Sequence, residues 1–209
     1  MLFDYVKFII NKKKGTPKMI DLNTYKREYR LRDGTKVLLR PMVKEDEEAL
    51  FEFFKGVPDE EARYLRDDVR NRSVIKKWAE ELDYSRTLPL LAFKKNDIIA
   101  DATLFRRRFG WKWHLGNVRI FVHKDYRKVG LGSLMIRETV DIAMKLKLEK
   151  LLAEIPANNI PAINAFRSCG FGRVAVIPGL ARDRENHPID IAIMTRDIEP
   201  LHEDEYYHL

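Results

Sequence analysis

Two glycines one residue apart, Gly130 and Gly132, stand where an alternating apolar segment gives way to a helical pattern, and Arg127 and Lys128 come just before them. Glycines let backbone N–H groups approach a ligand closely, and the first N–H groups of a helix favour an anion. The segment therefore suits a pyrophosphate. It lacks the Gly-Lys-Ser/Thr ending of the P-loop and the third glycine of the dinucleotide fingerprint. A strand-to-helix turn without a ligand is the competing interpretation, because short glycine motifs also occur by chance.

These residues need a strand before them and a helix after them. Alternating apolar residues predict the strand over 117–123, and an apolar stripe at helical spacing predicts the helix over 131–146. The other predicted elements are strands at 36–40, 88–93, 98–105, 151–155, 173–177 and 189–195, and helices at 1–10, 45–55, 59–82 (interrupted near 70–73) and 161–169.

The order of these elements indicates the fold class. A strand, a helix and a strand joined by short links imply a parallel pair, whereas the hairpin predicted over 88–105 implies antiparallel pairing. We therefore expect an α/β (α+β) fold, with a mixed central sheet of about six to seven strands and helices on both faces.

Three segments resemble, in the same order, the motifs of the GNAT superfamily of N-acetyltransferases. Residues 127–132 match its Arg/Gln-x-x-Gly-x-Gly/Ala signature, residues 37–41 with Asp46 resemble its first strand and helix, and residues 159–171 resemble its Asn-x-x-Ala…Gly-Phe segment. Together the motifs cover about residues 35–197. The resemblance implies the GNAT fold and an acetyl-CoA site where two central parallel strands move apart.

The resemblance also implies which residues bind acetyl-CoA. The end of the central strand would line the pantetheine through its backbone, the glycine segment would bind the pyrophosphate, and an asparagine would hydrogen-bond the pantetheine. No metal is implied. The residues assigned to the cofactor are Ile120, Phe121, Val122, Arg127, Lys128, Val129, Gly130, Leu131, Gly132, Ser133, Asn159 and Phe166.

Direct attack by an amine on the thioester, in a ternary complex, requires a base. An amine attacks only when neutral, and a free lysine amine has a pKa of about 10.4. In relatives that acetylate protein N-termini, a glutamate five residues before the asparagine is the base, and Glu154 has this spacing from Asn159. A structural hydrogen bond is the alternative role for Glu154. Backbone N–H groups near Val122 would stabilise the developing negative charge.

Two positions depart from the family pattern. Phe166 stands where many relatives carry the tyrosine that protonates the leaving thiolate, and Asn117 stands where relatives often place a glutamate base. Neither side chain transfers a proton near pH 7. The loss of the acid is tolerable because a thiol, with a pKa of about 8.5, leaves readily as the thiolate. Water or Tyr126 are the other proton sources considered.

Other reactive side chains have simpler explanations. His114 and His123 can act as bases, but each is expected to make an ordinary hydrogen bond near a strand end. Cys169 follows a predicted helix and is expected to be a packed thiol. Residues 106–113 combine three arginines with two tryptophans, like a nucleic-acid surface. At the tip of a hairpin they are expected to form a solvated loop beside the acceptor site instead.

The composition is that of one compact domain. The chain has 209 residues, of which 45% are hydrophobic and 34% charged, and its formal charge is +7. Residues 1–40 hold eleven basic and four acidic side chains, so the remainder is formally neutral. One cysteine excludes an internal disulfide framework. No apolar segment reaches the roughly 20 residues that cross a bilayer, and the first residues do not resemble a signal peptide. We expect a cytoplasmic protein.

We expect a basic N-terminal extension (1–29), a GNAT acetyltransferase domain (30–198) and an acidic tail (199–209). Residues 30–93 resemble most the bacterial protein lysine acetyltransferases that modify acyl-CoA synthetases. This implies a protein lysine acceptor, such as an acyl-CoA synthetase, and no nucleic-acid partner. The alternatives are a small amine, a protein N-terminus, or a CoA-binding regulatory module that has lost catalysis. A homodimer remains open.

Overall fold

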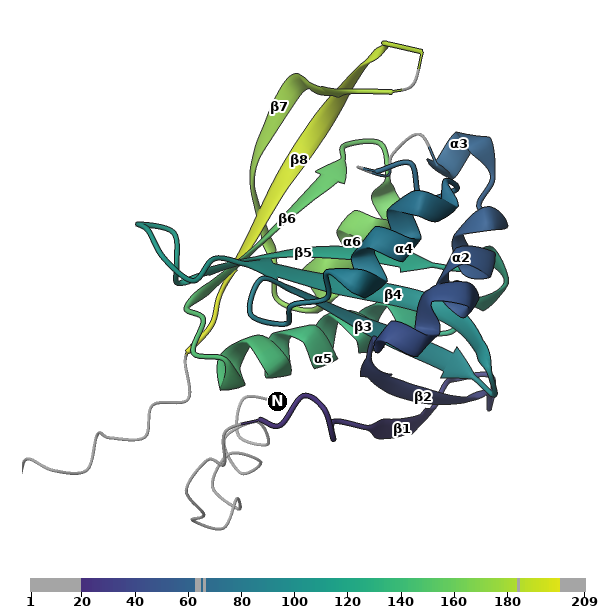
Figure 1. Cartoon of the computed structure of the whole chain (residues 1–209). Helices are drawn as coiled ribbons and strands as arrows, with labels where there is room; N and C mark the ends of the chain where they lie inside the picture. Colours follow the sequence, from purple (N-terminus) through teal and green to yellow (C-terminus); the bar gives the residue numbers. More distant parts are fainter. Residues whose placement is uncertain (1–19, 63–64, 66, 184, 200–209) are drawn as a thin grey trace, which may run out of the picture.

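The computed structural model describes residues 20–62, 65, 67–183 and 185–199 (Figure 1). The helix predicted at 1–10 and all of the acidic tail after residue 199 lie outside these residues. No helix in the described part of the chain is long and apolar enough to span a membrane.

The described residues form an eight-stranded sheet in the order β1-β2-β3-β4-β5-β6-β8-β7. Every neighbouring pair is antiparallel except β5 with β6. The strands are β1 (Arg27–Arg30), β2 (Lys36–Pro41), β3 (Thr87–Lys94), β4 (Asp97–Arg106), β5 (Leu115–Val122), β6 (Lys150–Pro156), β7 (Gly172–Arg182) and β8 (Pro188–Asp197). The helices are α2 (Glu47–Lys55), α3 (Asp59–Ala62), α4 (Arg72–Glu80), α5 (Leu131–Lys145) and α6 (Ile160–Ser168), with short 3₁₀ turns η1 (Lys44–Asp46) and η2 (Lys124–Tyr126).

The sheet has one strand more than the sequence predicted, and the additional strand is β1. Its sequence, Arg-Glu-Tyr-Arg, has no apolar alternation, and three of its four side chains are exposed. Only its pairing with β2 at the sheet edge makes it a strand. Residues 20–29, which the sequence assigned to the N-terminal extension, thus include part of an edge strand and the buried side chain of Tyr25.

The strand predicted at 173–177 is also longer in the structure. β7 continues through Pro178 and Gly179 to Arg182. The register with β8 shifts between Ile177 and Ala181, so the two residues lie within an irregularity of the strand rather than at its end.

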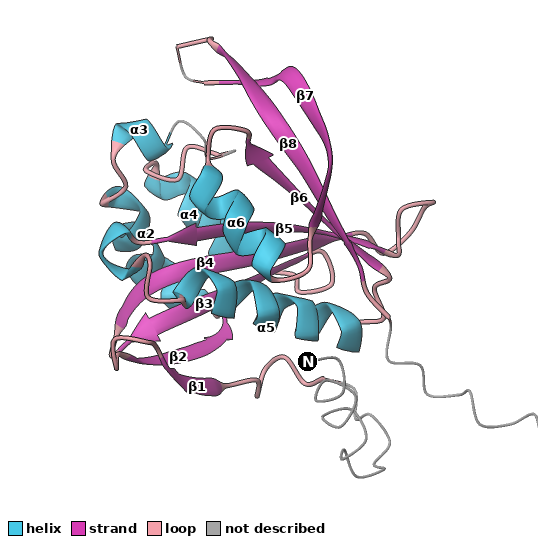
Figure 2. Cartoon of the chain, turned by 180° about the vertical axis from the view of Figure 1, so that it is seen from behind, coloured by secondary structure: helices cyan, strands magenta, loops and turns pink. Residues whose placement is uncertain are grey.

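Helices cover both faces of the sheet, as predicted. The helices α5 and α6 lie on one face and α2 and α4 on the other, as Figures 1 and 2 show from opposite sides. Successive side chains of a strand point to opposite faces. Leu90 of β3 accordingly belongs to the hydrophobic core under α5, and the next residue, Leu91, to the core under α2 and α4. We call these the α5 face and the α4 face.

The parallel strands β5 and β6 stay together for only a short distance. Their register runs from Leu115 opposite Lys150 to Asn117 opposite Leu152. Beyond that point β6 continues to pair with β8 and β5 with β4, and the two strands diverge (Figure 1). The polypeptide leaves the diverging end of β5 through η2 and enters α5, which places the glycine segment beside the opening.

Candidate functional site

The backbone of the glycine segment turns sharply before α5 begins. Lys128 has φ of 64° and Gly130 has φ of 91°, both in the left-handed region. A lysine rarely adopts this conformation, and such strained positions concentrate at ligand-binding sites. Left-handed turns direct neighbouring backbone N–H groups to one side, and the first N–H groups of α5 have no acceptor within the helix. The segment therefore presents several donors to an anion.

The two glycines are required for different reasons. Gly130 needs its left-handed φ. Gly132 lies in the first turn of α5, and a Cβ there would meet only the Val122 side chain at an ordinary 3.8 Å. Since nothing in the described protein excludes a side chain at Gly132, the glycine there is consistent with close approach by a ligand.

The two basic residues before the glycines differ in their surroundings. The guanidinium of Arg127 makes a two-bonded ion pair with Glu61 of α3, at 3.0 and 2.5 Å, and its Nε donates to the carbonyl oxygen of Val122 at 3.0 Å. The Glu61 carboxylate, which the sequence did not single out, thus partly neutralises the charge of Arg127. Lys128 is exposed beside the helix N-terminus.

The end of β5 leaves backbone groups available. After Asn117, the edge of β5 that faces β6 pairs with no strand among the described residues. Backbone N–H and C=O groups on such an edge need other hydrogen-bond partners. Ile120 and Val122 pack against the core of the α5 face, whereas the ring of Phe121 contacts that of Phe53 at 5.7 Å on the other face. These side chains hold the strand in the sheet.

The second wall of the opening begins at Asn159, which follows β6. Its side-chain oxygen accepts the backbone N–H of Ala162 at 3.2 Å and so caps α6. The amide nitrogen retains two N–H donors for a ligand carbonyl. Phe166, by contrast, is buried and packs edge-on against Phe171 at 4.9 Å between ring centres, within the hydrophobic core.

Glu154 lies two residues beyond the last pairing of β6 with β5. Its neighbours Ala153 and Ile155 are buried in the core of the α5 face, so its own side chain lies on the α4 face. It is exposed. The same alternation places Asn117 of β5 on the α4 face, since Val118 belongs to the opposite core. The structure therefore places Glu154, the predicted base, and Asn117 on the same side of the sheet.

The structure agrees with the simpler interpretations of His123 and Cys169, an ordinary hydrogen bond and a packed thiol. The Nδ1 of His123 accepts the backbone N–H of Asp125 at 3.4 Å and caps η2. Cys169 is buried, and its thiol lies 3.5 Å from the carbonyl oxygen of Ser133 on α5. Both side chains thus have structural contacts, and the ring of His123 also lies 3.7 Å from the Asp125 carboxylate.

The sequence motifs did not identify a buried polar group on the α4 face. Arg119 of β5 lies 3.5 Å from Asp101 of β4, and its guanidinium lies over the rings of Trp78 and Phe105 at 5.5 and 5.6 Å. Burial raises the pKa of Asp101, against the attraction of Arg119 and a hydrogen bond from Thr103. The Nη1 of Arg119 is buried and meets no acceptor in the part of the chain that the structure describes.

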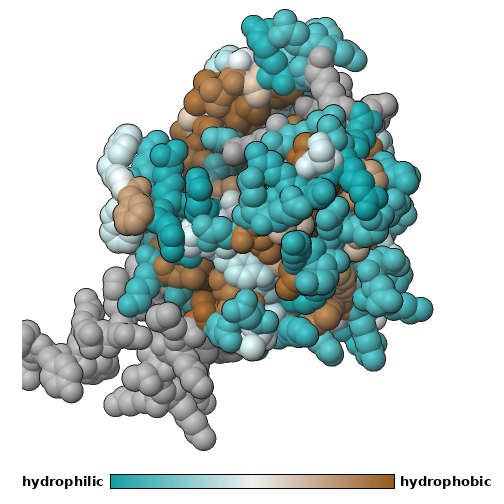
Figure 3. Space-filling view, in the orientation of Figure 1, coloured by the Kyte–Doolittle hydropathy of each residue, from teal (hydrophilic) through white to brown (hydrophobic). Residues whose placement is uncertain are grey.

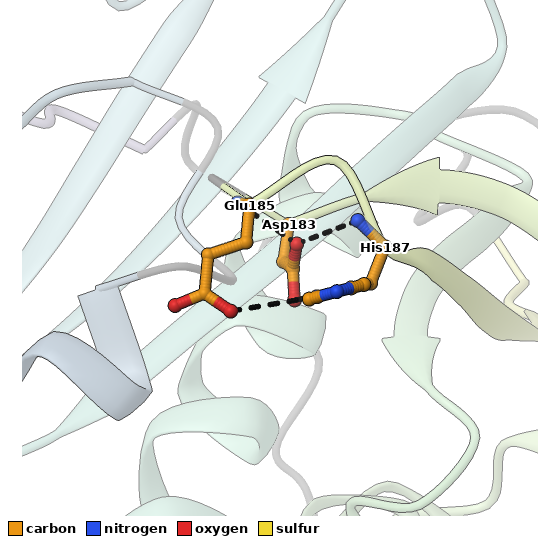
Figure 4. A group of neighbouring side chains, drawn as sticks. All are labelled: Asp183, Glu185 and His187. Atoms are coloured by element: carbon orange, nitrogen blue, oxygen red, sulfur yellow. Dashed lines mark hydrogen bonds and ion pairs between the residues drawn. The ribbon is translucent and has the colours of Figure 1, made fainter.

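The turn between β7 and β8 gathers Asp183, Glu185 and His187 (Figure 4). Asp183 accepts the backbone N–H groups of Glu185 and His187 at 3.0 and 2.9 Å, and hydrogen bonds from His187 lower the pKa of its carboxyl. The His187 ring lies 3.4 Å from both carboxylates. These hydrogen bonds account for the shape of the turn.

Comparisons with known proteins agree with this geometry. The candidate phosphinothricin acetyltransferase YwnH of Bacillus subtilis is 30% identical over 81 residues, which are 39% of this chain and 49% of that protein. The match thus spans about half of that relative.

Among solved structures, a GNAT-family acetyltransferase from Streptococcus pneumoniae has a TM-score of 0.68 at 22% identity and covers 78% of this chain and 99% of its own. The ribosomal-protein-S5-alanine acetyltransferase of Vibrio fischeri has a TM-score of 0.72 at 14% identity, covering 88% and 100%. A phosphinothricin acetyltransferase of Sinorhizobium meliloti, solved with acetyl-CoA, has a TM-score of 0.68 at 16% identity, covering 78% and 89%. These similarities confirm the expected fold.

The sequence model of the acetyltransferase (GNAT) family matches residues 43–171, which include α2, the diverging strands, the glycine segment and α6. The chain therefore belongs to the acetyltransferase (GNAT) family.

Proposed function

We propose that this protein transfers the acetyl group of acetyl-CoA to a protein lysine by direct attack in a ternary complex. One observation carries the proposal: β5 and β6 diverge beside the N-terminus of α5. The chain enters that helix through Lys128 and Gly130, which both have left-handed backbone conformations. This geometry offers a place for a long thioester arm and for its pyrophosphate at adjoining positions.

The residues present fit acetyl-CoA. The donors at the start of α5, with the positive charge of Lys128, suit the pyrophosphate. The unpaired edge of β5 and the amide of Asn159 suit the two amide groups of pantetheine. Acetyl-CoA supplies an activated acyl carbon and a leaving thiolate.

The chemistry requires one proton acceptor. As the amine nitrogen forms its bond to the carbonyl carbon and the C–S bond breaks, the nitrogen loses a proton and the sulfur leaves with the electron pair. In our proposal Glu154 takes that proton, directly or through water, because it is exposed and lies past the point of divergence.

Tyr126 is the proposed proton source for the thiolate, since the buried Phe166 has no proton to give. The Tyr126 hydroxyl accepts a hydrogen bond from the Lys94 ammonium at 3.1 Å, which leaves its own O–H free to donate. Tyr126 belongs to η2, between the end of β5 and the glycine segment.

An exposed surface next to β6 supports a protein acceptor. β8 pairs with β6, and β7, at the sheet edge, exposes the large apolar side chains Val174, Val176, Ile177 and Leu180. Figure 3 shows an apolar patch where β7 lies. A polypeptide around the acceptor lysine would find apolar surface there, whereas a small amine has no use for it.

Thiol release with acetyl-CoA tests the proposal. The acceptors are a purified acyl-CoA synthetase, small amines and an N-terminal peptide, and mass spectrometry locates any acetyl group. Acetylated lysine in the protein is the expected result. Acetyl-CoA binding without turnover on any acceptor would instead indicate the regulatory module. Sedimentation of the chain alone shows whether it forms a homodimer.

A small acceptor that carries an anionic group is the second candidate, and the unsatisfied Nη1 of Arg119 favours it. Three proteins named as phosphinothricin acetyltransferases are among the similar proteins. In this case Arg119→Lys should raise KM for an anionic amine without changing KM for acetyl-CoA. An unchanged KM for the amine would exclude Arg119 as its binding residue.

A further inference from the structure

A cavity of about 760 Å³ lies over the outer side of α5 and does not overlap the opening between β5 and β6. Its walls come from residues 29–32, from the first turns of α5, and from residues 168–170 with Arg196. The site described above uses only the glycine segment at the edge of this cavity. The remainder of its lining has no role in that site.

Arginines from three separate elements line this cavity. Arg32 follows β1, Arg137 lies on α5 and Arg196 on β8. The Nη1 of Arg196 donates to the Cys169 carbonyl oxygen at 2.5 Å, which holds the guanidinium at the wall. Arg32 and Arg137 are exposed, and neither makes an ion pair with a carboxylate of the described residues. Their charges are thus available to a ligand.

Arginines outnumber carboxylates in the lining of the cavity, which holds Arg30, Arg32, Arg137 and Arg196 against Glu138 and Asp141. Both carboxylate oxygens of Glu138 accept hydrogen bonds of 2.5 Å, one from the Tyr25 hydroxyl and one from that of Tyr29. Glu138 is itself buried. Apart from Glu138, Asp141 is the only carboxylate among the described residues of the lining. The cavity therefore favours an anion.

The cavity adjoins the place proposed for the pyrophosphate. The backbone N–H of Arg32 donates to the carbonyl oxygen of Val129 at 3.3 Å, and its Nε lies 3.6 Å from the position that a Cβ on Gly130 would occupy. Arg137 lies two turns further along α5. In CoA, a ribose joins the pyrophosphate to a further phosphate on its 3′ oxygen, and this monoester carries close to two negative charges at pH 7.

We propose that Arg32 and Arg137 bind the 3′-phosphate of CoA, with Arg196 on the opposite wall, and that the enzyme thereby distinguishes CoA from 3′-dephospho-CoA. This inference rests on the proposed use of acetyl-CoA. Guanidinium groups match phosphate oxygens in pairs, and such charge-assisted hydrogen bonds are stronger than neutral ones.

Calorimetry with CoA and with 3′-dephospho-CoA tests the inference. The wild-type chain should bind CoA at least about ten-fold more tightly, as expected for one or two charge-assisted bonds. Arg32→Ala and Arg137→Ala should each reduce this preference, and the double variant should nearly abolish it, while the affinity for 3′-dephospho-CoA stays unchanged. Arg137→Lys should retain part of it. Arg173→Ala removes an exposed arginine of β7 outside the cavity and should preserve the preference.

Two results would overturn the inference while leaving the proposed function intact: equal affinity of the wild-type chain for both compounds, or an equal loss for both in the arginine variants. A wild-type chain that binds neither compound would instead refute the proposed function, and this inference with it. Thermal unfolding by circular dichroism confirms that each variant is folded.

Discussion

The two sides of the proposed site differ in how they are built. On the cofactor side, one continuous segment from the end of β5 into α5 supplies the strand edge, the left-handed turn and the helix N-terminus. On the acceptor side, Glu154 comes from β6, Arg119 from β5, Asp101 from β4 and Trp78 from α4. Backbone geometry makes the first and side chains from four elements make the second.

The two constructions differ in how much sequence change they tolerate. A backbone turn needs only glycines at set positions and tolerates change elsewhere. A surface made of side chains from four elements can change its chemistry by single substitutions without altering the fold. The cofactor therefore follows from the family, and the acceptor has to be established for this protein.

The largest expected effect is on the cofactor side. Gly130→Glu or Gly132→Glu should abolish acetyl-CoA binding, because a side chain and a negative charge would occupy the space of the pyrophosphate. Calorimetry measures the loss. Gly172→Glu is the matched control, since a Cβ at Gly172 meets nothing within 4 Å and β7 lies outside the cofactor site. Unchanged affinity in both glycine-segment variants would refute the assignment.

The next effect concerns the acceptor side alone. Glu154→Gln should lower turnover by roughly 10²–10⁴-fold, the usual contribution of a general base, and leave the affinity for acetyl-CoA nearly unchanged. Steady-state rates between pH 6 and 9 check this, with Glu52→Gln on the exposed side of α2 as control. If the variant keeps near-normal rates, Asp101→Asn and His123→Ala become the next substitutions to test.

A third prediction concerns the anchor of β1 on α5. Tyr29→Phe leaves one oxygen of the buried Glu138 without its hydrogen bond and should lower the free energy of unfolding by about 1–3 kcal/mol. Burial and Glu138 raise the pKa of Tyr29 to about 12. The folded state holds this proton more tightly, so its contribution is complete below pH 10 and disappears as the pH rises towards 12.

Denaturant unfolding from pH 8 to 12 measures this effect. The loss of stability between pH 10 and 12 should be smaller in Tyr29→Phe than in the wild-type chain. An identical pH dependence in both chains would show that Tyr29 is not the titrating group.

The smallest expected effect concerns Gly132, and it tests whether a glycine is needed there for the approach of a ligand rather than for the backbone conformation. Gly132→Ala places a methyl group in ordinary contact with Val122 and improves the helix propensity of α5, so stability should stay equal or rise by up to about 1 kcal/mol. The affinity for acetyl-CoA should still fall, because the methyl group lies where the ligand approaches. Thermal unfolding and calorimetry on the same sample give both values. Unchanged affinity would mean that the ligand does not approach Gly132.

The sequence predicted most strands and helices because their apolar periods are local. The strand 117–123 and the helix 131–146 agree with β5 and α5 to within a few residues. It missed β1 because a charged edge strand has no apolar period and exists only by pairing with β2. Phe166 was assigned to the cofactor from its position in a motif, and its burial against Phe171 in the hydrophobic core was not apparent from that position.

What the sequence determined by itself is the family, the parallel strand pair and the glycine turn at the start of α5, since these depend on neighbouring residues along the chain. The tertiary structure alone decided that Arg127 pairs with Glu61, that Arg119 lies buried beside Asp101, and that Arg32 reaches Gly130. These partners lie 18 to 98 residues apart in the sequence, and no periodicity or spacing relates them. Only the folding of the sheet, with helices on both faces, brings these residues together.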